Sequence, residues 1–157
     1  MTTQYAAPQI SSSIFPTPTF AGWTRQNTTV TFTCPPGGLP IASCTSPVTV
    51  STEGTNQIIT GTVTDTAGTS VSTSVTLYID KTPPALTVTS PANGATFSSS
   101  SVTITGSISD NLSGVSSIDC NGAQASISAG NFSCNIGLVR VRRKAAFGQT
   151  GQANSDY

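Results

Sequence analysis

The chain has 157 residues, no histidine, and six basic and six acidic residues, so its formal net charge is zero. The lack of histidine excludes Ser-His and Cys-His nucleophiles and histidine-ligated zinc, and the scattered acids mark no carboxylate pair. Charged residues make up 8% of the chain and Ser and Thr about a third, which favours β structure with polar turns. We expect neither an enzyme nor a cofactor.

Residues 1–8 are expected to form an N-terminal extension. The first fifteen residues have no basic start and no apolar core of the kind found in signal peptides. No apolar run approaches the length of a membrane-spanning helix. We therefore expect no membrane insertion, and if the protein is exported, its export signal must lie outside this chain.

Residues 9–80 carry the alternation of an antiparallel β-sandwich. Val30, Phe32 and Cys34 share one face of a predicted strand over residues 28–34, and threonines occupy the other face. A Gly-containing turn and a second strand that ends at Cys44 are predicted to follow. Further strands are predicted at 48–51, 57–64 and 71–79, with turns at 35–38, 53–56 and 65–68.

The sequence "DKTPP" ends this first module. Two consecutive prolines cannot continue a strand ladder, so residues 81–84 are predicted to be a stiff, extended linker. The pattern then restarts in residues 85–139, where Val102, Ile104 and Ile108 share one face of a predicted strand. Shorter strands are expected at 113–120, 123–128 and 131–138.

The second module is expected to be incomplete. Residues 29–44 and 101–120 share one sequence pattern: an alternating strand, a Gly-containing turn and a second strand that ends at a cysteine. This similarity indicates two repeats of a unit of about 70 residues. The closing strands of the first repeat have no counterpart in the second, because residues 140–157 lose the alternation and gather four basic residues in "RVRRK". We expect this tail to be disordered. It is either native sequence or the product of a frameshift or truncation.

The four cysteines are predicted to form one disulfide in each module, Cys34–Cys44 and Cys120–Cys134. Neither pair has the two-residue spacing of a zinc knuckle or of a redox Cys-X-X-Cys motif. Cys34, Cys120 and Cys134 fall on core-facing positions, as an internal bridge requires. Unpaired buried thiols and a metal site are the alternatives. Disulfides imply an oxidising compartment.

Residues 9–139 resemble the bacterial immunoglobulin-like (Ig-like) repeats that occur in tandem in secreted and cell-surface proteins. The resemblance rests on residues 29–84, including the "DTAG" turn and "DKTPP", and on a related repeat in residues 90–122. It implies an all-β fold of two tandem Ig-like antiparallel β-sandwich modules, and no catalytic residues. It also implies a spacer, stalk or adhesive segment of a bacterial extracellular or cell-surface protein.

Candidate binding residues are few. Asp65, Asp80 and Asp110 lie in turns or at the module junction and are weak candidates for calcium, against the simpler interpretation that they cap turns. Trp23 is the candidate for stacking on a sugar ring, with Phe20 and Tyr5 as possible members of the same platform. The alternative is ordinary packing. "RVRRK" could bind an acidic partner, but a solvated tail is favoured, and no nucleic-acid partner is expected.

The expected partners are neighbouring Ig-like modules of a larger chain, together with a glycan or protein ligand at the cell surface. The second functional hypothesis is a carbohydrate-binding accessory module of a secreted glycan-active enzyme. Loss of glycan binding on Trp23→Ala would favour this second hypothesis over the spacer.

Overall fold

The computed structural model describes residues 4–19 and 21–138. Within them the chain forms strands and no helix, and therefore no helix long and apolar enough to cross a membrane. The predicted tail at 140–157 lies outside the described residues. The strands are β1 (Ser11–Phe15), β2 (Thr28–Thr33), β3 (Ile41–Cys44), β4 (Val48–Val50), β5 (Gly54–Asp65), β6 (Ser70–Ile79), β7 (Ala85–Ser90), β8 (Ser101–Ser109), β9 (Asp119–Cys120), β10 (Ala123–Gln124), β11 (Ser126–Ser128) and β12 (Asn131–Gly137).

The described residues divide into two compact units. The first unit holds residues up to Leu86 together with the segment Ile108–Ser116. The second unit holds Thr87–Ser107 and the residues from Ser117 onward. The all-β fold expected from the sequence is confirmed, and the predicted domain boundaries stay predictions.

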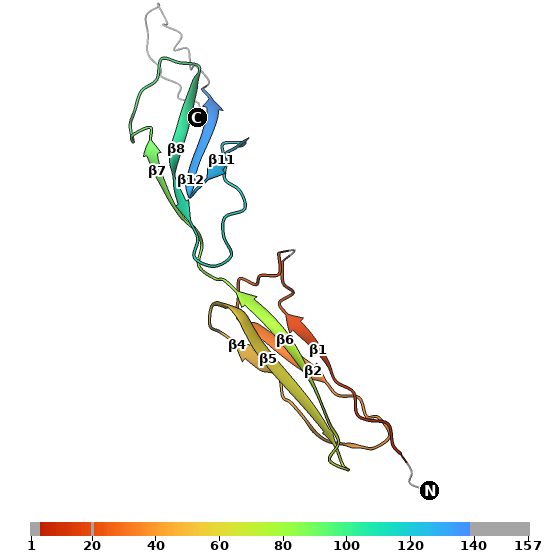
Figure 1. Cartoon of the computed structure of the whole chain (residues 1–157). Coiled ribbons are helices and arrows are strands. Elements are labelled where there is room, and N and C mark those ends of the chain that lie inside the picture. The colour runs from red at the N-terminus through yellow and green to blue at the C-terminus, as the bar shows by residue number, and fades with distance from the viewer. Residues whose placement is uncertain (1–3, 20, 139–157) are drawn as a thin grey trace, which may run out of the picture. The chain divides into compact units, whose positions relative to one another are not determined.

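The first unit is a sandwich of two three-stranded antiparallel sheets, with strand orders β1-β2-β4 and β3-β5-β6 (Figure 1). The alternation in β2 places Val30 and Phe32 inward, with 0% and 6% of their surface exposed. They pack against Leu77 and Ile79 of β6, which are likewise buried. Period-2 patterning therefore predicted the core of this unit correctly, because both facing strands bury alternate residues.

The outer face of the β5–β6 hairpin is lined by paired hydroxyl groups. Three cross-strand pairs have oxygen–oxygen distances of 2.8–2.9 Å: Thr60–Ser74, Thr62–Ser72 and Thr64–Ser70. Neighbouring side chains directly opposite one another in antiparallel strands are close enough to bond. The Ser- and Thr-rich composition thus covers the solvent face of the hairpin with satisfied polar groups.

The second unit contains the four-stranded sheet β11-β12-β8-β7 and the two-residue strands β9 and β10 (Figure 1). Phe132 and Cys134 of β12 are buried, with 3% and 4% of their surface exposed. Val102 and Ile136 pair at the other end of the sheet and are only half-buried. The core described for this unit is therefore thinner than that of the first.

Three predictions about individual elements were wrong or incomplete. Residues 53–56 were predicted as a turn, but β5 already begins at Gly54, and a bulge between Gly54 and Gln57 absorbs the left-handed residue Asn56 (φ 53°). The strand predicted at 113–120 is reduced to Asp119–Cys120. Strand β1 was not predicted, because "SSSIF" has too few apolar residues to show alternation.

Candidate functional site

Both disulfides form as the sequence predicted, and each joins two different sheets. Cys34 directly follows β2 and Cys44 ends β3, with their Cα atoms 6.1 Å apart. Cys120 of β9 is bonded to Cys134 of β12, with their Cα atoms 6.5 Å apart. Within each unit the covalent link therefore holds one sheet against the other, and all four cysteines are used.

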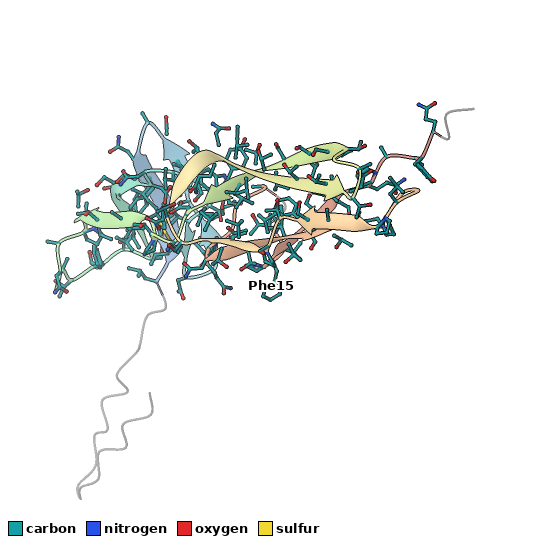
Figure 2. The ribbon with its side chains drawn as sticks, turned by 90° about the horizontal axis from the view of Figure 1, so that it is seen from below. Phe15 is labelled. Atoms are coloured by element: carbon teal, nitrogen blue, oxygen red, sulfur yellow. A yellow bond between two sulfur atoms is a disulfide. The ribbon has the colours of Figure 1, made fainter. Side chains whose placement is uncertain are left out.

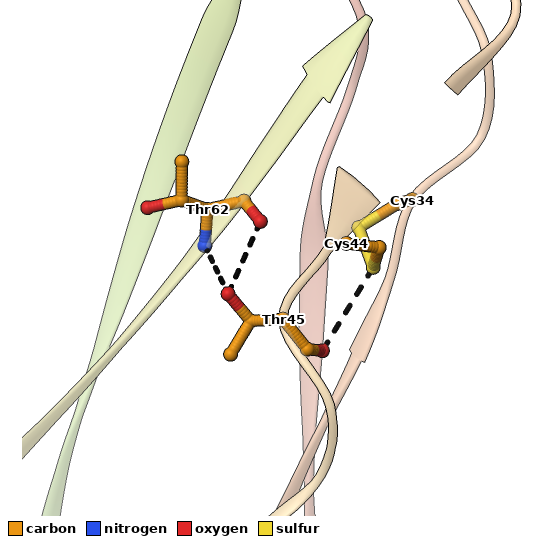
Figure 3. The surroundings of a disulfide bond; sticks show 4 residues. All are labelled: Cys34, Cys44, Thr45 and Thr62. Atoms are coloured by element: carbon orange, nitrogen blue, oxygen red, sulfur yellow. Dashed lines mark hydrogen bonds between the residues drawn. A yellow bond between two sulfur atoms is a disulfide. The ribbon is translucent and has the colours of Figure 1, made fainter. Parts of the chain in front are cut away.

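The residue after the first disulfide is hydrogen-bonded to β5, the central strand of the sheet β3-β5-β6 (Figure 3). Thr45 follows Cys44, and its hydroxyl accepts the Thr62 N–H at 2.8 Å and donates to the Thr62 carbonyl at 3.1 Å. The Cys44 sulfur lies 3.9 Å from the Thr45 carbonyl, which is a contact rather than a hydrogen bond because a disulfide sulfur carries no proton. The Cys44 end of the bridge is thus held to β5.

Two of the calcium candidates, Asp65 and Asp110, cap tight turns. In each case one carboxylate oxygen accepts the backbone N–H groups two and four residues further on, at 2.7–3.0 Å: Ala67 and Thr69 for Asp65, Leu112 and Gly114 for Asp110. This geometry is the turn-capping alternative considered from the sequence. Among the described residues no group of three or more acidic, cysteine or histidine side chains could hold a metal ion.

The third candidate, Asp80, is 5% exposed and lies within the first unit. Its carboxylate accepts the N–H of Thr82 at 3.1 Å and that of Ser113 at 2.9 Å. The Ser113 side chain is the main cause of a lowered pKa for Asp80; burial opposes it, and the two backbone N–H groups and Asp110 add to it. Asp80 therefore holds the segment around Ser113 as a charged acceptor.

The "DKTPP" segment is tied back to the first unit at its start. The Lys81 N–H donates to a Glu53 carboxylate oxygen, and the Thr82 hydroxyl lies 3.0 Å from both oxygens of the same group. The Lys81 ammonium donates to the Asn27 side chain at 3.2 Å and to the Ser51 carbonyl. The first residues of the predicted stiff linker are thus anchored by charge-assisted hydrogen bonds.

Trp23 is half-buried, and its ring packs edge-to-face on Tyr78, with ring centroids 5.6 Å apart and planes at 61°. The next residue, Thr24, runs parallel to the end of β6 and exchanges backbone hydrogen bonds with Tyr78 and Asp80. Trp23 therefore contributes to packing at this end of the sandwich. Its role in ligand binding stays a prediction, and Phe20 lies outside the described residues.

Tyr5 does not join Trp23 in an aromatic platform. It lies beside the 65–69 turn, where β6 begins, whereas Trp23 packs at the end of β6. The ten residues of β6 span about 33 Å, so one sugar ring cannot contact both side chains. Sequence reasoning could not place these two aromatic residues, because neither belongs to an alternating strand.

A hollow of about 750 Å³ opens at the end of the first unit where Tyr5 lies. We call this end the loop end; it comprises residues 4–7, 35–40 and 65–69. The described residues that line the hollow come from all three segments: Gln4, Tyr5, Ala6, Ala7, Leu39, Asp65, Ala67 and Thr69. Sequence reasoning missed this site. The signal that could have found it is "PPGG", because glycines without side chains allow another segment of the chain to pack directly on this loop.

Comparison with known families assigns one part of the chain. Residues 84–137 match the family described as "Bacterial Ig domain". Comparison with curated proteins and with solved structures gave no significant match. The family match covers β7 to β12, the part in which the sequence showed its second, related repeat.

Proposed function

We propose that the chain is a non-catalytic spacer or stalk segment, with an adhesive role, of a bacterial extracellular or cell-surface protein, because residues 84–137 match the bacterial Ig domain family. The observation that carries the proposal is the disulfide between the two sheets of each unit. Such bridges persist in oxidising surroundings, and they hold thin β-sandwiches together without a large core.

The inventory of side chains supports a non-catalytic role. The chain has no histidine, and its three candidate aspartates are engaged by backbone N–H groups in turns. The neighbouring partners proposed for the chain are further Ig-like modules, joined through short anchored linkers such as Lys81–Thr82.

Single-molecule pulling tests the spacer role. We expect each unit to resist extension as a discrete event and to refold after relaxation. In the first unit, the residues enclosed by Cys34–Cys44 cannot extend until the bridge is reduced. Ten residues span about 35 Å when extended, and the bridge already spans 6.1 Å between the two Cα atoms, so reduction should add about 29 Å of extension. A chain that extends smoothly without resistance would contradict the spacer proposal.

Export is tested separately by non-reducing peptide mapping of protein made in an oxidising compartment. We expect the peptides to be linked Cys34–Cys44 and Cys120–Cys134. Four free thiols under these conditions would contradict the extracellular location.

The second candidate function, a carbohydrate-binding accessory module, is favoured by one observation, the hollow at the loop end with its exposed tyrosine.

A further inference from the structure

We propose that the loop end of the first unit binds a neutral saccharide, with Tyr5 as the stacking platform. This inference goes beyond the spacer role and rests on the second candidate function, for which it names the ligand class and the stacking residue. The volume of the hollow, about 750 Å³, falls in the range of small-ligand sites. Tyr5 lines the hollow and is 55% exposed, so its ring can be covered by a ligand without any rearrangement of the core.

The three segments of the loop end are held in place by backbone hydrogen bonds. The Gly38 N–H donates to the Ala6 carbonyl at 2.9 Å, and the Gln9 N–H donates to the Pro35 carbonyl at 3.2 Å. The Thr66 N–H donates to the Pro40 carbonyl at 3.0 Å, which joins the segment 65–69 to the segment 35–40. The Cys34–Cys44 bridge closes the loop that carries the central segment. The site is therefore preformed, which lowers the entropic cost of binding.

The position of Tyr5 depends on the second glycine of "PPGG". A β-carbon at Gly38 would lie 2.9 Å from the Tyr5 β-carbon and 3.1 Å from its Cδ1. A β-carbon at Gly37 would overlap the carbonyl groups of Ala6 and Ala7. The absence of side chains at both positions thus lets the segment that carries Tyr5 lie directly on the loop.

The chemistry of the lining favours a neutral, hydroxylated ligand with an apolar face. No lysine or arginine is among the described lining residues, so these residues offer no positive charge to a phosphate or a carboxylate. One oxygen of the Asp65 carboxylate already accepts two backbone N–H groups of its own turn. Gln4 and Thr69 offer amide and hydroxyl groups. A pyranose can place its C–H face on the Tyr5 ring and its hydroxyls against these groups.

Two other aromatic residues of the same unit provide controls. Phe15 is 77% exposed, and Figure 2 shows its ring pointing away from the ribbon. It does not belong to the described lining of the hollow. Trp23 lies at the opposite end of β6 and packs on Tyr78. Substitutions at Tyr5, Phe15 and Trp23 therefore separate binding at the loop end from non-specific contact with an aromatic ring elsewhere on the unit.

The test is a titration of the isotope-labelled full chain with lactose, cellobiose, maltose and diacetylchitobiose, followed through backbone amide shifts. We expect at least one disaccharide to shift the amides of Tyr5, Leu39 and Thr69. Tyr5→Ala should weaken that binding about tenfold, and Phe15→Ala and Trp23→Ala should leave it unchanged. Gly38→Ala retains the ring but displaces it, so it should also weaken binding.

Two outcomes would overturn the proposal. One is the absence of shifts at the loop end with all four disaccharides. The other is binding that survives Tyr5→Ala, including binding that is instead lost on Trp23→Ala. Both are independent of the pulling experiment, so a failure of the saccharide site and a failure of the spacer role can be told apart.

Discussion

The ring of Phe32 lies directly against Gly61, so that a β-carbon on Gly61 would overlap the ring atoms Cδ1 and Cε1. Phe32 belongs to β2 and Gly61 to β5, which are strands of opposite sheets. The largest side chain of the first core is therefore accommodated by the absence of one across the sandwich. Close packing of this kind leaves no space for an added methyl group.

Gly61→Ala should lower the free energy of unfolding of the first unit by about 1–3 kcal/mol, because the added methyl group forces Phe32 or the β5 backbone to move. Chemical denaturation followed by tryptophan fluorescence measures this change, since Trp23, the single tryptophan, lies in the first unit. The loss should be smaller when Phe32 has been replaced by leucine, because the ring atoms that the added methyl group meets are then absent. Equal stability of Gly61→Ala and wild type would contradict the overlap.

The disulfide Cys34–Cys44 should contribute about 3 kcal/mol to the stability of the first unit in the chain-entropy account, given its sequence separation of 10 residues. We expect the double substitution Cys34→Ser and Cys44→Ser to lower the free energy of unfolding by about this amount. Urea denaturation followed by Trp23 fluorescence should show it as a lower midpoint. Reductant should lower the wild-type midpoint and leave that of the double variant unchanged. A wild-type midpoint that does not respond to complete reduction would refute the prediction.

Asp80 should make the stability of the first unit depend on pH. Its pKa is lowered in the folded state, chiefly by the Ser113 side chain, from an ordinary value of 3.8. The charged form is thus favoured by folding. Its contribution is fully present above the unfolded pKa and is lost as the pH falls through the folded pKa. Asp80→Asn should therefore be less stable than wild type at neutral pH, and the difference should shrink in acid.

Denaturation of wild type and Asp80→Asn between neutral pH and a pH below 3.8 measures that difference in stability. The comparison variant is Asp119→Asn, whose exposed side chain accepts a hydrogen bond from Gly122 in its own turn. A difference between wild type and Asp80→Asn that stays constant, or grows, below pH 3.8 would rule out the proposed role of the Asp80 charge.

Calcium should leave the thermal midpoint unchanged, because Asp65, Asp80 and Asp110 already accept backbone N–H groups in or beside their turns. Differential scanning fluorimetry with added calcium and with chelator measures this. A ligand that binds only the folded state would raise the midpoint with its concentration. If such a rise occurred and vanished in Asp80→Asn or Asp110→Asn, the calcium interpretation of these residues would be restored.

Several features of the fold could be predicted from local patterns. The alternation in residues 28–34 and 71–79 identified β2 and β6 and their buried faces, because a strand buries alternate residues whichever strand it faces. The cysteine spacing and the repeat boundary predicted both disulfides. Strand β1 escaped prediction because only one of its residues, Ile14, packs against the core, and one buried apolar residue shows no alternation.

By itself, the sequence thus determined the all-β class, the core faces of the longest strands and the disulfide pairing, which all follow from residue type and spacing along the chain. Only the tertiary structure decided that Gly61 receives the Phe32 ring, that Trp23 packs on Tyr78, and that Tyr5 rests on Gly38 at the loop end. These relationships join residues 29, 55 and 33 positions apart. Which residues meet in each pair depends on how the two sheets and the loops pack together. A local sequence pattern does not contain this information.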